Sequence, residues 1–400
     1  MFWTYWTAET ASSVGSAVSS VAMPLIAVTL LRARPLEMGL IAAAGFLAWP
    51  VIGLPAGAIA QRLPLRGTQV LMDAVRAVAV LSVPVAWWWG HLTITYLIVT
   101  ALVLGFADVL FEVCTATFLP SIVSRDLLQA RNSLMSGTYS VTQLGGPTLG
   151  GVLVQLLGAV PTLVIDAVSY AASALLLRTL PARRIEAPDA WPPMRAMVRE
   201  GWNFVVRHPV MGPCLWFATA VNFVCGAQMA LFALYLVREL HAPAGLVGLM
   251  LATEGAGSLI GAALTPRLTR AAGTARACVA AGIISTAGAL VIPAGTGVAA
   301  YLLFAAGNIA FAGGVVVFSV STRTYQQTAS PPELLPRVMA TVRFVSFGVI
   351  PVGSLLGGAL AGVVGSRAAL LALGALTFLA PLALIMSPVR RQRDLAVQVS

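Results

Sequence analysis

The chain consists of long apolar runs separated by short breaks that carry Arg, Pro or Gly. A membrane-spanning helix needs about 20 predominantly apolar residues. Runs of that length lie at 8–31, 37–60, 68–90, 92–118, 133–157, 161–180, 210–237, 244–266, 275–294, 297–320, 338–362 and 367–387. The pattern therefore predicts twelve transmembrane helices, an even number that places both chain ends on one side of the membrane. The first run is too long for a cleaved signal, and we interpret it as a retained helix.

Composition supports a polytopic membrane protein. Of the 400 residues, 58% are hydrophobic and only 10% are charged, and the mean hydropathy is +0.90. Soluble domains carry about 25% charged residues, so this chain has too little charge to cover a water-exposed surface. Disorder, coiled coil and collagen are excluded by the same composition. We expect an all-α membrane protein.

The basic residues are all Arg, and their placement tests the helix count. The formal net charge is +10. Of the 24 Arg residues, 18 fall in loops after even-numbered expected helices or in the C-terminal tail, four fall on the opposite side, and two fall inside helices. Cytoplasmic loops carry the excess of positive charge, so both termini are expected in the cytoplasm. The surplus is interpreted as topogenic charge, with no nucleic-acid partner.

The longest loop divides the chain into two halves. We expect a six-helix bundle over 1–180, a cytoplasmic linker with an amphipathic helix over 181–209, a second six-helix bundle over 210–387 and a cytoplasmic tail over 388–400. A shift of 207 residues places Gly146, Gly150, Gly151 and Gly158 on Gly353, Gly357, Gly358 and Gly365. Six plus six helices with a weak parallel repeat are typical of transporters with two rocking bundles.

Ionisable residues inside the expected helices are the candidates for function, because each costs about 2.5–3.5 kcal/mol to insert. Glu254 lies mid-helix with no Arg near it in sequence, which makes it a candidate protonation site. The alternative is a neutral Glu bonded to a neighbouring helix. Asp108 and Glu112 are four apart and share a helix face. They either couple to protons or a cationic substrate, or form a fixed lock with Arg76 or Arg125.

The remaining intramembrane charges form an expected charge network. Asp73 and Arg76 are three apart and are expected to pair with each other or to support the adjacent loop. Arg343 is expected to pair with an acid or to extend to the interface, and Asp166 is interpreted as structural. Glu9 lies at the start of the first helix and is a further candidate.

Three stretches carry a family resemblance. The first, residues 53–66, lies between the second and third expected helices; it is called the signature loop below and contains Gly53, Gly57, Gln61, Arg62 and Arg66. The second, residues 145–151 in the fifth helix, contains Gly146, Pro147, Gly150 and Gly151. The third runs over 118–133. Together they resemble the major facilitator superfamily, and within it the drug- and siderophore-exporter branch of enterobactin-exporter and macrolide-efflux-like proteins.

The resemblance implies the major facilitator fold, with residues 145–151 as the antiporter motif. It also implies a central cavity lined by helices 1, 4, 7 and 10, with wall candidates Asn222, Gln228, Asn308 and Trp216. The family usually has Asp where this chain has Gln61. That difference weakens the expected cytoplasmic latch or shifts it to other acids.

Other function classes lack their motifs. There is no phosphate-binding Gly-x-x-x-x-Gly-Lys, since the chain has no Lys, and no hydrolase or metalloprotease motif. We expect no enzyme activity, no cofactor and no metal site. The prediction is a monomeric, proton-coupled antiporter in the cell membrane that exports a small amphipathic or hydrophobic compound such as a drug, antibiotic or siderophore. A proton-coupled importer and a non-transporting receptor or scaffold remain the alternatives.

Overall fold

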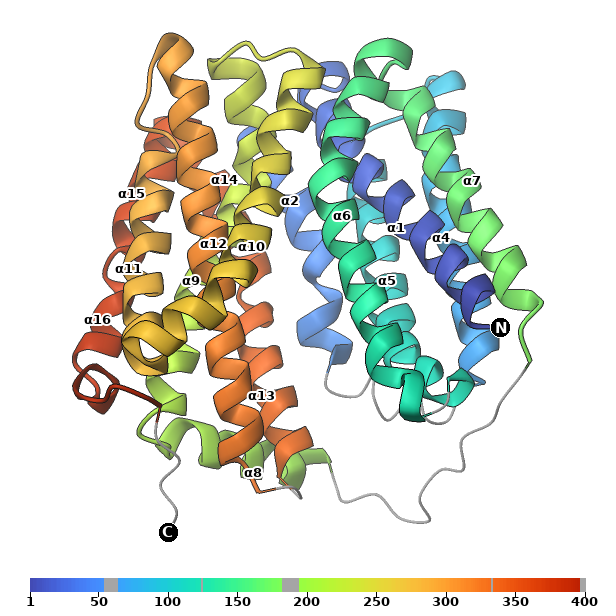
Figure 1. The fold of residues 1–400 in the computed structure, drawn as a ribbon. Helices are drawn as coiled ribbons and strands as arrows, with labels where there is room; N and C mark the ends of the chain where they lie inside the picture. Colours follow the sequence, from blue (N-terminus) through green and yellow to red (C-terminus); the bar gives the residue numbers. More distant parts are fainter. Residues whose placement is uncertain (54–63, 124, 182–193, 332–333, 396–400) are drawn as a thin grey trace. The chain divides into compact units, whose positions relative to one another are not determined.

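The computed structural model describes residues 1–53, 64–123, 125–181, 194–331 and 334–395, and all regular elements among them are helices (Figure 1). Within these ranges, eleven helical spans are long and apolar enough to cross a membrane. They correspond to eleven of the expected spans. The remaining one, 133–157, lies in α6 (Arg125–Leu157), a 33-residue helix that Ser, Thr and Gln residues make less apolar. The expected all-α membrane fold is confirmed.

The first of two compact units comprises Met1–Ala190 and Leu236–Ala252. Its elements are α1 (Phe2–Leu25), the π-helical turn η1 (Ile26–Leu30), α2 (Pro35–Phe46), α4 (Leu65–Trp88), α5 (Ile94–Ile122), α6 and α7 (Ala159–Arg178). Most of the π-helical turn η2 (Tyr235–Glu239) and the first part of α10 (Ala244–Ala272) complete it. Helix α1 packs against α6 and α7, and α4 packs against α5 and α7 (Figure 1).

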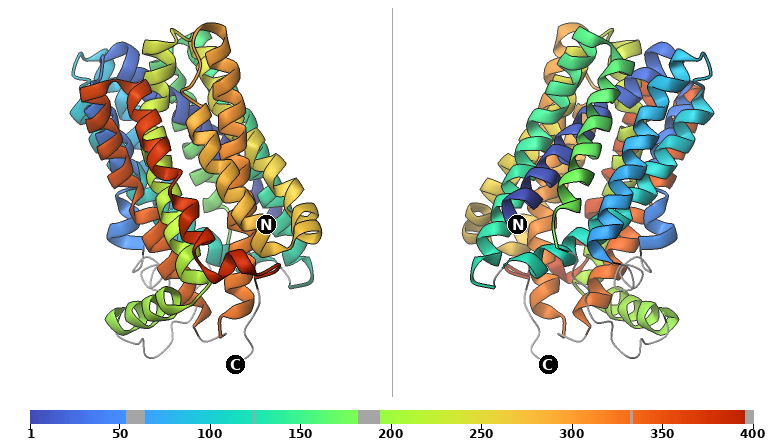
Figure 2. Two further views of the ribbon diagram at one scale, coloured as in Figure 1. Left: turned by 90° about the vertical axis from the view of Figure 1, so that its left-hand side faces the viewer. Right: turned by 90° about the vertical axis from the view of Figure 1, so that its right-hand side faces the viewer.

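The second compact unit comprises Trp191–Tyr235 and Thr253–Ser400. Besides the rest of α10, its elements are α8 (Met194–Arg207), α9 (Met211–Leu234), α11 (Thr274–Val291), α12 (Gly297–Ala329), α13 (Leu335–Gly348), α14 (Ile350–Val364), α15 (Ser366–Thr377), α16 (Ala380–Ile385) and η3 (Pro388–Arg391). Helix α9 packs on α14, and α11 packs on α12. Helix α8 lies across the direction of α9 and α13 rather than along it (Figure 2).

The core of the second unit is apolar and aromatic. Phe217 of α9 is buried and its ring centroid lies 4.5 Å from that of Phe318 on α12. Such tilted ring pairs stabilise the core beyond what the burial of each ring contributes.

The 207-residue repeat is visible in the backbone. Gly158 and Gly365 precede α7 and α15 with φ of 90° and 86°, and Gly90 and Gly297 have φ of 72° and 56°. This left-handed conformation favours glycine because a Cβ would collide with the backbone. The same shift therefore relates both the sequence and the turn geometry of the two halves. The division into bundles over 1–180 and 210–387 stays a prediction, because the packing of the helices does not measure whether the bundles move independently.

Candidate functional site

A charge cluster in the first unit is centred on Arg76 of α4. Its Nη1 donates to Asp73 Oδ1 at 3.1 Å, one turn earlier on the same helix. Its Nη2 lies 2.8 Å from Asp108 Oδ1 on α5 and donates to the Ala107 carbonyl at 3.4 Å. The expected Asp73–Arg76 pairing is therefore present, and Arg76 also joins α4 to α5.

Aromatic rings enclose the same guanidinium. The Arg76 Cζ lies 4.2 Å from the ring centroid of Phe111 and 5.5 Å from that of Tyr170. Tyr170 in turn shares a hydrogen bond of 2.8 Å with Ser16 of α1. A cation over a ring face gains attraction that grows when water is excluded. Arg76 is 5% exposed, so its position is fixed by α1, α4, α5 and α7 together.

The two acids of α5 differ from Asp73 in their exposure. Asp73 is fully buried, whereas 58% of the Asp108 side chain is exposed. Glu112 lies one turn further along the same helix and is also exposed. Of the two partners expected for this pair, Arg76 contacts Asp108, and the Arg125 side chain lies outside the described residues.

Asp166 of α7 is fully buried in the first unit. Its Oδ1 accepts a hydrogen bond from Ser169 Oγ at 3.3 Å, and its Oδ2 has no hydrogen-bond partner within the described part of the chain. A Cβ at Gly15 on α1 would collide with the carboxyl group. The absence of a side chain at Gly15 therefore provides the space for Asp166.

The second unit contributes Glu254, in the middle of α10. Its side chain is exposed and makes neither a hydrogen bond nor an ion pair with the residues that the structure describes. The neighbouring Thr253 accepts a hydrogen bond from Asn308 Nδ2 of α12 at 2.9 Å. Among the described residues, no cation pairs with this carboxyl group.

The other predicted positions in the second unit have mixed exposure. Trp216 is 50% exposed, whereas Gln228 and Asn308 are buried. Asn222 is half-buried and donates from Nδ2 to the Ala218 carbonyl at 3.1 Å. The Arg343 Cζ lies 5.7 Å from the ring centroid of Phe347, one turn further on α13.

The glycines of residues 145–151 form close helix contacts within the first unit. A Cβ on Gly146 would collide with Ala17 of α1, and one on Gly150 would lie 3.0 Å from the Val18 carbonyl. A Cβ on Gly151 would lie 2.8 Å from Gly248 Cα on α10, which also contacts the Pro147 carbonyl. Small residues let helix backbones approach where lipid gives no hydrophobic drive.

Most of the signature loop lies outside the described residues, including Gly57, Gln61 and Arg62. At its ends, Gly53 faces the Trp49 ring, and Arg66 Nη1 donates to the Leu180 carbonyl. The consequence of Gln61 in place of the usual acid stays a prediction.

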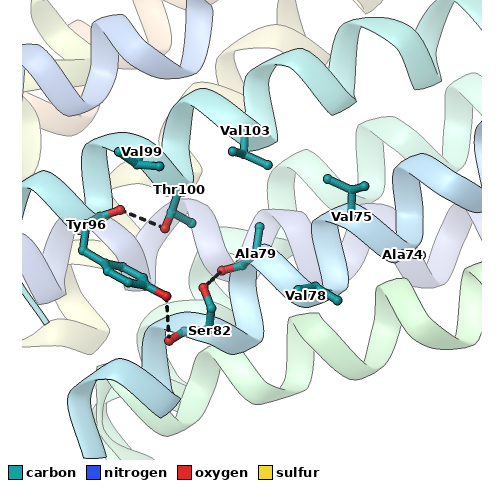
Figure 3. A pocket seen from close by; sticks show the side chains of 9 residues that line it. All are labelled: Ala74, Val75, Val78, Ala79, Ser82, Tyr96, Val99, Thr100 and Val103. Carbon is teal, nitrogen blue, oxygen red and sulfur yellow. Dashed lines mark hydrogen bonds between the residues drawn. The ribbon is translucent and has the colours of Figure 1, made fainter. Parts of the chain in front are cut away.

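An apolar groove of about 500 Å³ lies between α4 and α5, and none of its lining residues belongs to the charge cluster (Figure 3). Val78, Val99 and Val103 contribute to its lining, and the Tyr96 hydroxyl donates to the Ser82 carbonyl at 3.4 Å. It contains no carboxylate or basic group, so the polar chemistry of the unit lies elsewhere. Within the described residues, no group of three His, Cys, Asp or Glu side chains could hold a metal ion.

The fold and the intramembrane charges define a class of multi-pass membrane transporters. The sequence matches the family of transmembrane secretion effectors over residues 1–400. It is 27% identical over 396 residues to the multidrug efflux pump Tap of Mycolicibacterium fortuitum, covering 96% of this chain and 95% of that one. It is 24% identical over 337 residues to the MFS-type transporter YvqJ of Bacillus subtilis (strain 168), covering 82% and 78%.

Solved structures share the fold. The nucleoside transporter NupG matches with a TM-score of 0.77 at 11% identity, over 96% of this chain and 98% of that one. A bacterial homologue of the iron transporter ferroportin in an inward-facing state matches with a TM-score of 0.70 at 16% identity, over the same shares. The chain belongs to the transmembrane secretion effector family of the major facilitator superfamily, as its motifs predicted. It is a transporter rather than an enzyme.

Sequence reasoning did not include Glu9 among its principal sites. In the structure this carboxylate accepts hydrogen bonds from Tyr5 and Thr115. The available signal was an acid within an otherwise uncharged first helix. Its partner on α5 is 106 positions away, a pairing that no local pattern indicates.

Proposed function

We propose that this transporter exports a small amphipathic or hydrophobic compound in exchange for protons, by alternating access. One observation carries the proposal: carboxylates at membrane depth lack a cation of their own among the described residues. Asp73 and Asp108 share Arg76, and neither Asp166 nor Glu254 makes an ion pair within the described chain. Since an ionised side chain at membrane depth costs about 2.5–3.5 kcal/mol, a bound proton is the direct means of neutralising these acids.

Proton binding supplies the differential free energy that a transport cycle needs. Protonation of Asp108, Glu112 or Glu254 removes charge from the membrane interior and favours one packing of the helices, and substrate favours the other. The transmembrane potential adds about 2.3 kcal/mol per charge per 100 mV. Asp108 and Glu254 are suited to this role because both side chains are exposed.

Export is supported by the antiporter-like glycine contacts of Gly146, Gly150 and Gly151 and by the relative named as a multidrug efflux pump. The amphipathic or hydrophobic nature of the substrate is inferred from the apolar chain and the exposed Trp216. The Arg distribution supports cytoplasmic termini in a plasma membrane. A monomer is the simplest assembly for a complete six-plus-six repeat.

Purified protein in liposomes tests the proposal, with the cationic dye ethidium as the probe. An imposed pH gradient should drive dye across the membrane against the proton flow, and dissipating the gradient should stop it. Asp108→Asn and Glu254→Gln should lose this response, whereas Glu37→Gln, on an exposed helix end, should keep it. Dye flux that ignores the gradient would indicate a pore, and co-directional flux would indicate an importer. If none of a panel of amphipathic compounds moves, the hypothesis of a scaffold or receptor replaces the hypothesis of an exporter.

A further inference from the structure

Glu9 of α1 lies in a hydrogen-bonded group apart from the Arg76 cluster. Its Oε1 accepts hydrogen bonds from the hydroxyls of Tyr5, at 2.9 Å, and Thr115 of α5, at 3.0 Å. Tyr5 is fully buried, whereas Glu9 is partly exposed. The carboxylate is therefore held by two helices and remains partly exposed.

Gln69 of α4 completes the group and leaves one atom unused. Its Nε2 donates to Thr115 Oγ1 at 3.0 Å and to the Tyr5 hydroxyl at 3.5 Å. Gln69 is fully buried, and its Oε1 has no hydrogen-bond partner among the described residues. Buried acceptors are almost always satisfied in folded proteins, so this oxygen is an acceptor that a rearranged group could use.

The direction of these hydrogen bonds fits an ionised Glu9. The Gln69 amide donates to both hydroxyls, and both hydroxyls donate to the carboxylate. If Glu9 takes up a proton, its new O–H needs an acceptor. Turning the Gln69 amide over presents Oε1 to the two hydroxyls, which then donate to Gln69, and one of them accepts from the protonated Glu9. One amide rotation thus gives the added Glu9 proton an acceptor.

Glu9 makes no ion pair with the residues that the structure describes. Arg76 interacts with Glu9 at long range; its Nη atoms bond to Asp73, Asp108 and a carbonyl, and its Nε has no hydrogen-bond partner in the described chain. The ionisable and charged groups on its own helix and on the surrounding elements are Tyr5 on α1, Asp73 and Arg76 on α4, Asp108 and Glu112 on α5, Arg131 on α6, and Asp166 and Tyr170 on α7.

We propose that Glu9, Tyr5, Thr115 and Gln69 form a proton-binding site in the first unit, separate from the Arg76–Asp108 pair. Glu9 takes one proton from water and returns it to water. The two hydroxyls keep their own protons and only reorient, so no other group changes its charge. This inference deepens the proposed function, because it assigns one coupling proton to a site that the Arg76 cluster does not include.

Infrared spectroscopy of the purified protein tests the site without requiring transport. A carboxyl C=O band should appear and disappear as pH is varied between about 4 and 9, a range that covers ordinary and buried carboxyl groups. Glu9→Gln should remove part of that band, and the matched Glu37→Gln should not. Thr115→Val should shift the frequency of the Glu9 band without removing it, because one hydrogen bond is lost. Thr162→Val, at a buried Thr on α7 that bonds only its own helix, should leave the band unchanged.

An unchanged band in Glu9→Gln would overturn the site. If that variant does not fold, Thr115→Val and Gln69→Leu replace it. A carboxyl band whose frequency neither substitution shifts would also overturn the site. The dye experiment separates this result from the proposed function. A Glu9 band with gradient-independent transport leaves the site intact and removes proton-coupled export. Gradient-driven export together with an unchanged band in Glu9→Gln would remove the Glu9 site and leave proton-coupled export intact.

Discussion

Arg76 of α4 and Asp108 of α5 form an ion pair with an Nη2–Oδ1 distance of 2.8 Å, in which the cation is buried and 58% of the Asp108 side chain is exposed. One partner of the pair, Arg76, is thus buried, and the other, Asp108, is exposed. Protonation of Asp108 would release the Arg76 Nη2 while Nη1 stays on Asp73. We expect this asymmetry to give the α4–α5 contact two states that differ by one proton.

Arg76→Gln should strongly destabilise the protein. The substitution leaves Asp73 fully buried without a cation, and breaking a buried pair from one side costs about 3–5 kcal/mol. Thermal unfolding in detergent measures the effect. Arg34→Gln, at an exposed position before α2, is the control and should unfold like the wild type. Equal unfolding temperatures for Arg76→Gln and Arg34→Gln would contradict the role of Arg76 as the centre of the cluster.

Gly151→Ala and Gly145→Ala should have opposite effects, although both lie in α6. A Cβ at Gly151 would be 2.8 Å from Gly248 Cα, whereas nothing lies within 4 Å of one at Gly145. Overpacking costs about 1–3 kcal/mol, while Gly→Ala in an open helix position gains up to about 1 kcal/mol. Dye transport and unfolding temperature should fall in the first variant only. Equal behaviour would mean that α6 and α10 do not make this contact in the membrane.

The space around two glycines of α14 predicts a similar contrast. A Cβ at Gly357 would be 2.9 Å from Ala227 Cα on α9, whereas one at Gly362 meets open space. Gly357→Ala should therefore lower stability by about 1–3 kcal/mol, and Gly362→Ala should not. Unfolding curves of the two variants, measured side by side, check the prediction. A destabilised Gly362→Ala with an unaffected Gly357→Ala would contradict the close contact of α14 with Ala227 of α9.

His208 should make the second unit less stable in mild acid. Its Nδ1 accepts hydrogen bonds from the backbone N–H of Val210 and Met211, at 3.2 and 3.3 Å. Only a histidine with a free Nδ1 lone pair can do this, and burial lowers the pKa of His208 from its ordinary value of 6.5. When folding lowers the pKa of a group, the group contributes stability at pH values above its unfolded-state pKa. That stability is lost as the pH falls through the folded-state pKa.

The measurement for His208 is unfolding temperature between about pH 7.5 and about pH 5, the range in which a histidine changes charge. His208→Asn should reduce the pH dependence, because an amide oxygen can accept the same hydrogen bonds without titrating. His91→Gln, at an exposed position, should retain the wild-type dependence. A wild-type protein whose stability rises as the pH falls would contradict this assignment.

Asp394 should stabilise α11 from the C-terminal segment. Its Oδ1 accepts from Thr274 N at 2.9 Å, and Leu395 N donates to Thr274 Oγ1 at 2.7 Å. Removing such a cap costs about 0.5–2 kcal/mol, so Asp394→Ala should lower the unfolding temperature. Arg390→Ala, at an exposed position, is the control. No difference between the two variants would show that the segment does not cap α11.

Local patterns were sufficient to predict the apolar spans, the Asp73–Arg76 pair and the equivalence of Gly158 with Gly365. Each depends on residues close in sequence or on one fixed shift. The Glu9 group depends instead on residues 46 and 106 positions apart, which only the packing of α1, α4 and α5 brings together. Similarly, sequence left Arg76 and Arg125 open as partners of Asp108, because the choice depends on how the helices rotate against each other.

The most direct test of proton antiport is a measurement of proton movement in liposomes that contain ethidium inside and a pH indicator in the lumen, with no imposed pH gradient and the membrane potential clamped. Dilution should let the dye leave through the wild-type protein and acidify the lumen, because each exported dye molecule is exchanged for entering protons. Asp108→Asn should give no acidification. Dye exit with an unchanged or more alkaline lumen in the wild type would contradict the account.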